Sequence, residues 1–162
     1  MRIPKSLFMS LVPVSVWLSS RPALEGWTRR VMRGFGAFTM LLMQAKPQTG
    51  IESIGKEWQR MFPSDDDVPI TKITNETVFA EVHVQCGHRD TGNVRGCHRM
   101  MEYDRKMLER IGGQLVILRS QAEPGVPVCQ LAIRKAGAPL ADLTHAHERA
   151  GEEPNPSELA NG

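Results

Sequence analysis

The sequence predicts an α+β fold in which N-terminal helices precede a ββαββ unit, whose mostly antiparallel sheet carries helices on one face. Two observations predict this fold. Up to residue 62 the apolar side chains recur at helical spacing, whereas from residue 68 they alternate with polar ones. One amphipathic segment then separates two pairs of alternating segments, as expected for a helix that connects two hairpins.

The composition indicates one domain with a short addition at each end. A chain of 162 residues can bury one ordinary core but not comfortably two. From residue 135 onward, glycine, proline, alanine and charged residues dominate without periodicity. We therefore expect an apolar arm or leader over residues 1–23, a single domain over 24–134 and an unstructured tail over 135–162.

Charge and cysteine usage exclude several classes of protein. The net charge is only +2 and no run of lysine and arginine is interleaved with aromatic residues, so we expect no nucleic-acid partner. The three cysteines are odd in number and form no C-x-x-C pair, which argues against a disulfide framework and a zinc ribbon. Reduced thiols in a cytoplasmic protein fit this pattern.

Residues 7–18 form an apolar run behind Arg2 and Lys5, which is the pattern of a signal peptide. The run is too short to span a bilayer, so we expect no transmembrane segment. Pro13 interrupts it and no clean cleavage site follows, which favours an arm that lies on the domain or in a partner groove. An exported protein is the alternative. The segment could also pair with another protein, and the partners that we expect are a small-molecule ligand and further copies of the chain in a homo-oligomer.

Two helices are expected next. Apolar side chains recur at helical spacing from Trp27, and Pro47 follows the end of the pattern, so we expect a helix over 24–46. A second amphipathic helix begins at Ile51 and stops at Pro63. The remaining expected elements are strands over 68–73 and 78–85, a helix over 97–111 that Gly112 ends, and strands over 114–120 and 128–134 around a turn at Gly125.

A sheet covered by helices can enclose an apolar pocket. Six methionines on the expected helices would give such a pocket an adaptable lining, because methionine is flexible and polarisable. They are Met40, Met43, Met61, Met100, Met101 and Met107. Filling gaps in an ordinary core is the alternative role for the same side chains.

Residues whose side chains can take part in catalysis or metal binding gather between Val82 and Cys129, on short elements with clear ends. Cys86 ends an expected strand, and Cys97 and His98 open the expected helix that carries Asp104. Two further members follow on the later strands, Arg119 and Cys129. We expect any chemistry of the protein to lie among these side chains.

These residues resemble the L-2-amino-thiazoline-4-carboxylic acid hydrolase-like family and, more distantly, vinyl-reductase-type small-molecule-binding domains. The similarity rests on residues 81–86, on the helical segment from Met101 to Asp104, on residues 115–125 and on Cys129, about a third of the chain. The family pattern often has a cysteine three residues before the helical acid. This chain has Met101 there and places its cysteine one turn earlier, at Cys97.

The resemblance implies a hydrolase that opens a small cyclic amidine such as an aminothiazoline carboxylate. That reaction needs a nucleophile, a proton donor for the departing nitrogen and a cation for the carboxylate. Arg119 would bind the carboxylate through its planar fork, and Cys97, at a helix N-terminus, would be the nucleophile. His98 or His83 would carry the proton. The other residues expected at the substrate are Asp104 as a catalytic acid, Met101 and Cys86.

Metal binding and non-catalytic binding are alternatives. Cys86, Cys97 and Cys129 offer thiolates suited to zinc, with His88 and His98 as further donors, and a zinc ion with an open position would activate water. His145 and His147 form a weaker pair near the end of the chain. A sensor or accessory domain that binds a small molecule or a metal would use the same residues without turnover. A hydrolase requires Cys97, Asp104 and Arg119 to face one solvent-reached cavity.

Overall fold

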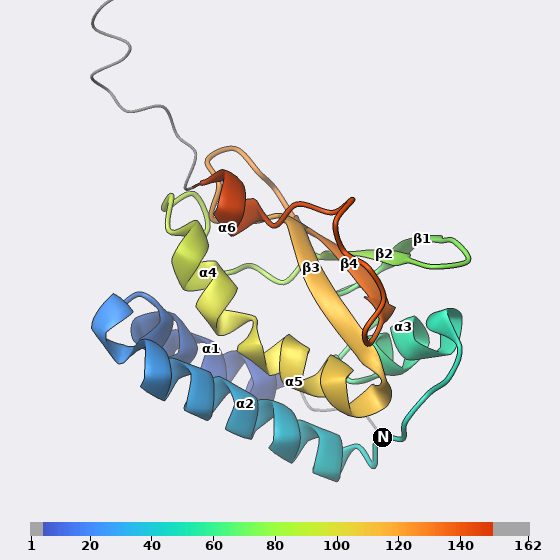
Figure 1. The fold of residues 1–162 in the computed structure, drawn as a ribbon. Helices are drawn as coiled ribbons and strands as arrows, with labels where there is room; N and C mark the ends of the chain where they lie inside the picture. Colours follow the sequence, from blue (N-terminus) through green and yellow to red (C-terminus); the bar gives the residue numbers. More distant parts are fainter. Residues whose placement is uncertain (1–4, 151–162) are drawn as a thin grey trace, which may run out of the picture.

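A computed structural model describes residues 5–150 and confirms the α+β prediction: a layer of helices packs against a four-stranded antiparallel sheet (Figure 1). None of the helices in this range is both long and apolar enough to cross a membrane. In chain order the helices are α1 (Lys5–Ser19), the short 3₁₀ turn η1 (Pro22–Leu24), α2 (Glu25–Leu42), α3 (Ile51–Arg60), α4 (Val94–Met100), α5 (Glu102–Ile111) and α6 (Ala146–Arg149). The strands are β1 (Ile70–Ile73), β2 (Val78–Val82), β3 (Gly113–Arg119) and β4 (Cys129–Lys135).

The two predicted hairpins, β1–β2 and β3–β4, are both present and lie side by side in the sheet order β1-β2-β4-β3. Strands β2 and β4 join them, with Val82 opposite Cys129 and Val78 opposite Ile133. This register brings the chain that leaves β2, which contains Cys86, beside the first residue of β4. Two cysteines 43 residues apart are thereby placed at the same end of the sheet.

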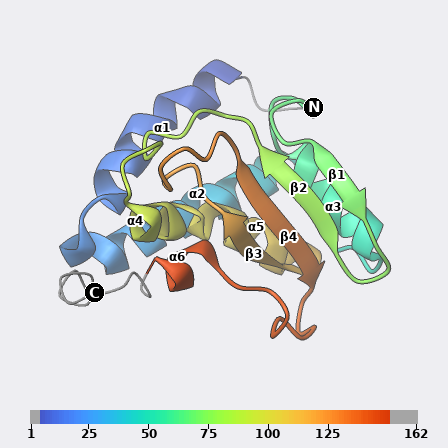
Figure 2. The same ribbon diagram turned by 90° about the horizontal axis from the view of Figure 1, so that it is seen from above.

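The core lies between the sheet and the helical layer (Figure 2). Many of its fully buried side chains come from α3, α5 and β4, among them Ile54, Trp58, Met107, Leu108, Leu131 and Ile133. Helices α2 and α5 approach each other closely at Gly36, where a Cβ atom would lie 2.7 Å from the Tyr103 carbonyl oxygen. A larger side chain at this position would force the two helices apart.

The expected helix over 97–111 is in fact two helices, α4 and α5, separated at Met101. Helix α4 begins three residues earlier than predicted because the Asn93 side chain accepts a hydrogen bond from the Gly96 backbone nitrogen at 2.9 Å and so caps it. Cys97 is therefore the fourth residue of a helix and not its first. Helix α5 ends as predicted at Gly112, which has a left-handed backbone with φ of 94°.

The apolar N-terminal run forms α1, which lies across α2 and α4 (Figure 2). Its end is fixed by Ser19, whose hydroxyl lies 2.7 Å from the His88 Nε2 atom. The Ser19 carbonyl oxygen also accepts a hydrogen bond from Arg99 Nε at 2.9 Å. In the described part of the arm, α1 lies on the domain, and it contributes Val12 and Ser15 to the cavity described below.

Residues 135–150 differ from the unstructured tail that composition predicted, whereas residues 151–162 lie outside the described residues. Strand β4 continues to Lys135, and α6 packs against α4 and β3 with Ala146 buried in the core. The connecting segment is held by buried Arg134, whose two terminal nitrogens each donate to Asp142 at 2.6 Å. Paired polar contacts, which have no periodicity in the sequence, order this segment.

Candidate functional site

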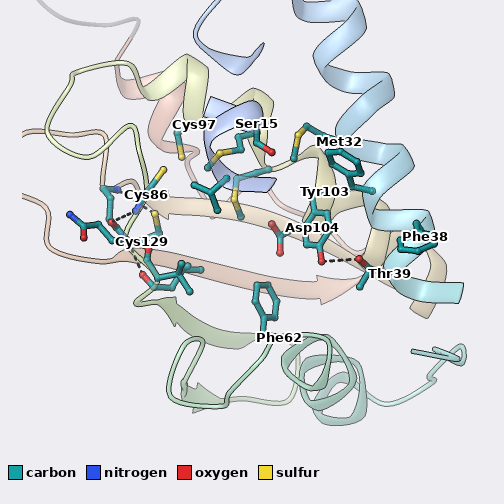
Figure 3. A pocket seen from close by; sticks show the side chains of 18 of the residues that line it. Ser15, Met32, Phe38, Thr39, Phe62, Cys86, Cys97, Tyr103, Asp104 and Cys129 are labelled. Carbon is teal, nitrogen blue, oxygen red and sulfur yellow. Dashed lines mark hydrogen bonds between the residues drawn. The ribbon is translucent and has the colours of Figure 1, made fainter. Parts of the chain in front are cut away.

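A cavity of about 140 Å³ opens between α1, α2 and the ends of β2 and β4 (Figure 3). Its walls come from both halves of the chain and are mainly apolar. Helix α2 supplies a large part of the apolar wall, and further apolar side chains come from α1, from the segment after α3, from the end of β2 and from the junction of α4 and α5. Among the contributors are Met32, Phe35, Phe38, Phe62, Val82 and Met101. A small concave site with apolar walls and few polar groups is the usual form of a ligand pocket.

The three cysteines, Cys86, Cys97 and Cys129, line one end of this cavity (Figure 3). Burial raises the pKa of Cys86 to about 11. The pKa of Cys97 is raised by its hydrogen bond with Cys129 and by burial. A thiol needs to lose its proton to attack or to bind metal, so Cys86 and Cys97 are both in their unreactive form at neutral pH.

Gln121 organises this end of the cavity, and sequence reasoning missed it. Its buried side-chain amide donates to the Val82 and Val84 carbonyl oxygens, both at 3.0 Å, and accepts from the Cys86 backbone nitrogen at 3.2 Å. Its backbone nitrogen donates to Cys129 Sγ at 3.3 Å. The single glutamine fixes the chain beyond β2 against β4, a role that no motif or period indicates.

Asp104 lies deeper in the cavity as a buried carboxyl group (Figure 3). One of its oxygens accepts a hydrogen bond from Trp58 Nε1 at 3.0 Å. Burial raises the pKa of Asp104 to about 6, although the Trp58 hydrogen bond opposes the change. Beside it, the Tyr103 hydroxyl lies 3.1 Å from Thr39 Oγ1 of α2. The sequence had not indicated Trp58 or Thr39 as partners of the cavity residues.

Five of the seven predicted site residues line the cavity: Cys86, Cys97, Met101, Asp104 and Cys129. Arg119 does not, because it ends β3 beyond a shift in strand register and points outward, where its Nε lies 3.5 Å from Glu123. His98 lies outside the cavity too, on another side of α4. The other proposed proton carrier, His83, is exposed and pairs with Glu81 at 2.7 Å. None of the described lining residues is lysine, arginine or histidine.

The methionine prediction is right for two of six side chains. Met100 and Met101 line the cavity, together with Met32, which had not been singled out. The other four, Met40, Met43, Met61 and Met107, are buried but do not line it. Their role is core filling, the alternative that the sequence left open.

A second cluster lies on another side of α4, where His98 meets His145 and His147 from the start of α6. One ring nitrogen of each histidine lies within 4.8 Å of the others. Within residues 5–150 these histidines are the set of three metal-ligand side chains that meets this distance, and the set Cys86, Cys97 and Cys129 does not. His88 is elsewhere, buried against Ser19.

Comparison of the chain with family models, curated proteins and solved structures yields no match to any of them. The protein is therefore characterised by its α+β architecture, by the cavity that the three cysteines and Asp104 line, and by the cluster of three histidines.

Proposed function

We propose that the protein binds a small, mainly apolar molecule that carries one basic or hydrogen-bond-donating group. The observation that carries this proposal is an apolar cavity of about 140 Å³ with one buried carboxyl group, that of Asp104. An apolar cavity of roughly 150 Å³ accepts benzene, so a ligand built on a single ring has the appropriate size. Binding without turnover corresponds to the sensor or accessory domain, one of the alternatives that the sequence left open.

The charge of the lining favours a cation over an anion. Asp104 is the acidic side chain among the described lining residues, and it faces no basic partner across the cavity. A buried charge is costly unless it is paired, so an amine or amidine placed against Asp104 gains an ion pair that a neutral ring lacks. A carboxylate ligand would meet like charge and no cation. An amidine-bearing ring therefore fits best.

Hydrolysis of an aminothiazoline carboxylate, the activity that the resemblance implies, has weaker support. The cavity offers Cys97 and Asp104, but the cation and the imidazole needed for that reaction, Arg119 and His98, lie outside it. The raised pKa of Cys97 also opposes its use as a nucleophile. These three findings favour binding.

Titration calorimetry with three probes of matched size tests the proposal: benzamidine, indole and benzoate. We expect benzamidine to bind most tightly, indole more weakly and benzoate least. Asp104→Asn should remove the preference for benzamidine but leave indole binding, whereas Val84→Phe should fill the cavity and weaken both. Arg119→Ala is the matched control and should change neither.

Equal affinity for benzamidine and benzoate, or no binding of any probe to a folded protein, would refute the proposal. Incubation with 2-aminothiazoline-4-carboxylate separates the hydrolase from the binding domain. If the ring absorbance is lost with the parent protein but not with Cys97→Ser, the protein turns the substrate over and Cys97 is required.

A further inference from the structure

Three of the five histidines in the sequence gather at one place, outside the cavity and on segments far apart in the chain. The ring centroids of His98 and His147 are 3.6 Å apart, those of His145 and His147 are 5.0 Å apart, and those of His98 and His145 are 5.8 Å apart. All three rings are half-buried. Such close approach of three imidazoles calls for a physical explanation, because each neutral ring has a nitrogen lone pair that must be satisfied by a hydrogen bond or a metal ion.

We propose that His98, His145 and His147 bind a divalent metal ion of the zinc type. Neutral imidazole is the preferred nitrogen ligand of Zn²⁺, and three histidines with an open fourth position are an established zinc arrangement. The site is independent of the cavity ligand.

The backbone holds the two histidines of the C-terminal segment in place. Ala146, between them, is buried in the core, and the Glu148 side chain accepts a hydrogen bond from the His145 backbone nitrogen at 3.1 Å. Arg149 donates to the Leu118 carbonyl oxygen of β3 and so anchors the other end of α6. Two imidazoles are thus presented to His98 by a segment that is fixed on both sides.

The distances require only side-chain adjustment. Nitrogens that bind one tetrahedral zinc ion at about 2.0–2.1 Å lie about 3.4 Å from one another. The three ring nitrogens already lie within 4.8 Å. The difference of at most about 1.4 Å is within the reach of rotations of the imidazoles about their side-chain bonds.

One nitrogen of the cluster has an unused lone pair or N–H group. The Nδ1 atom of His147 is buried and has no hydrogen-bond partner among the described residues. A buried polar atom without a partner is costly, and a bound metal ion would supply a partner to such a nitrogen.

Arg105 makes the site sensitive to one further side chain. Its guanidinium donates to His98 Nδ1 at 2.8 Å and also contacts the His98 carbonyl oxygen and Glu102. A metal ion bound to the His98 ring would be repelled by this neighbouring cation. Removing the charge should therefore tighten metal binding, the opposite of what removing a histidine does.

The test is a Zn²⁺ titration of the full chain, freed of any affinity tag and of metal, in competition with a chromophoric chelator. We expect one equivalent to bind, and Co²⁺ to give the visible spectrum of a nitrogen-ligated site. His98→Gln and His147→Gln should each weaken binding by about tenfold or more. Arg105→Gln should strengthen it. His83→Gln, an exposed histidine outside the cluster, is the matched control and should leave the affinity unchanged.

Circular dichroism and the thermal midpoint without metal show whether each variant is folded, and only folded variants are compared. Absence of stoichiometric zinc binding, or equal binding by His147→Gln, would overturn the proposal. Protection of the thiols from alkylation by zinc would also overturn it, since the ion would then be held by cysteines. Benzamidine binding should be the same in His147→Gln as in the parent protein. The metal site and the cavity ligand are therefore tested independently of each other.

Discussion

The two sides of helix α4 have different surroundings, although the residues that represent them, Cys97 and His98, are adjacent in the sequence. Cys97 is 2% exposed and lines the cavity, whereas the adjacent His98 is half-buried in the histidine cluster. Successive residues on a helix point about 100° apart, so the same short helix supplies both. One side offers an apolar cavity with three thiols at one end, and the other offers three imidazoles close together. Adjacency in sequence therefore gives no reason to place two reactive residues in one site.

Arg105 is the charged group that both sides share. Its charge favours the ionised forms of Asp104 and Cys97 and disfavours the protonated form of His98. It nevertheless makes its direct side-chain hydrogen bonds to His98 and Glu102, and it does not line the cavity. The Arg105 charge thus acts on the cavity residues without a direct contact, whereas in the histidine cluster Arg105 contacts His98 directly. Variants that alter one side and leave the other intact test this division.

The largest effect is expected from Gly36→Val, which should disrupt the cavity side alone. Its Cβ would lie 2.7 Å from the Tyr103 carbonyl oxygen, so α2 must move away from α5. We expect a loss of about 3 kcal/mol in the free energy of unfolding. Urea denaturation measures the loss, and benzamidine binding should fall with it. Gly34→Val is the control, because nothing beyond the neighbouring part of its own helix lies within 4 Å of its Cβ position. A stability loss as large in the control would refute the packing argument.

Asp104→Asn should make the protein more stable at neutral pH. The pKa of Asp104 rises from 3.8 to about 6 in the folded state. Between these values the folded protein holds a proton that the unfolded chain has lost, so stability falls as pH rises through this window. At pH 7.5 the buried charge costs up to about 3 kcal/mol, which asparagine avoids while still accepting from Trp58. Urea unfolding from pH 4 to 7.5 should show a gain that vanishes at the acid end. A gain independent of pH would contradict the assignment.

Asp142→Asn should affect the histidine side and leave the cavity unchanged. It weakens the paired hydrogen bonds that hold residues 136–150 to Arg134, and with them the position of His145 and His147. We expect zinc affinity to fall severalfold while benzamidine affinity stays constant, both measured by calorimetry. Asp66→Asn, another exposed aspartate, is the control. Equal loss of both ligands would mean that the two sides are coupled.

The smallest effect concerns the rate of thiol alkylation. Because burial raises the pKa of Cys86 to about 11, its reaction with iodoacetamide should be slow at pH 7.5. The rate should rise about tenfold for each pH unit toward pH 11, as the thiolate fraction grows. Mass spectrometry of the labelled peptide follows the rate. A plateau near pH 8.5 would show an ordinary, solvated thiol.

Much of the fold could be predicted because periodicity reports burial directly. The change of period after Pro63 located the sheet, and the cysteines and Asp104 were correctly grouped because they lie on neighbouring elements. The early start of α4 was not predicted, since it depends on a cap at Asn93 outside the expected helix. Arg119 was misplaced for a similar reason: the shift in register between β3 and β4 turns its side chain away.

The histidine cluster shows a different limit of sequence reasoning. His145 and His147 follow a segment without apolar periodicity, and what orders that segment is the bidentate pair of Arg134 and Asp142. A pair of this kind has no sequence signature, because its members are eight residues apart and one of them is exposed. The proximity to His98 is a property of the folded chain alone.

The wide separation of the cavity walls along the chain has a consequence for biosynthesis. The walls extend from Val12 to Cys129, so a growing chain cannot close the cavity until β4 has left the ribosome. Contacts between such distant segments form slowly compared with local ones. His145 and His147 emerge later still, so the three imidazoles can meet only after all the walls of the cavity have been synthesised.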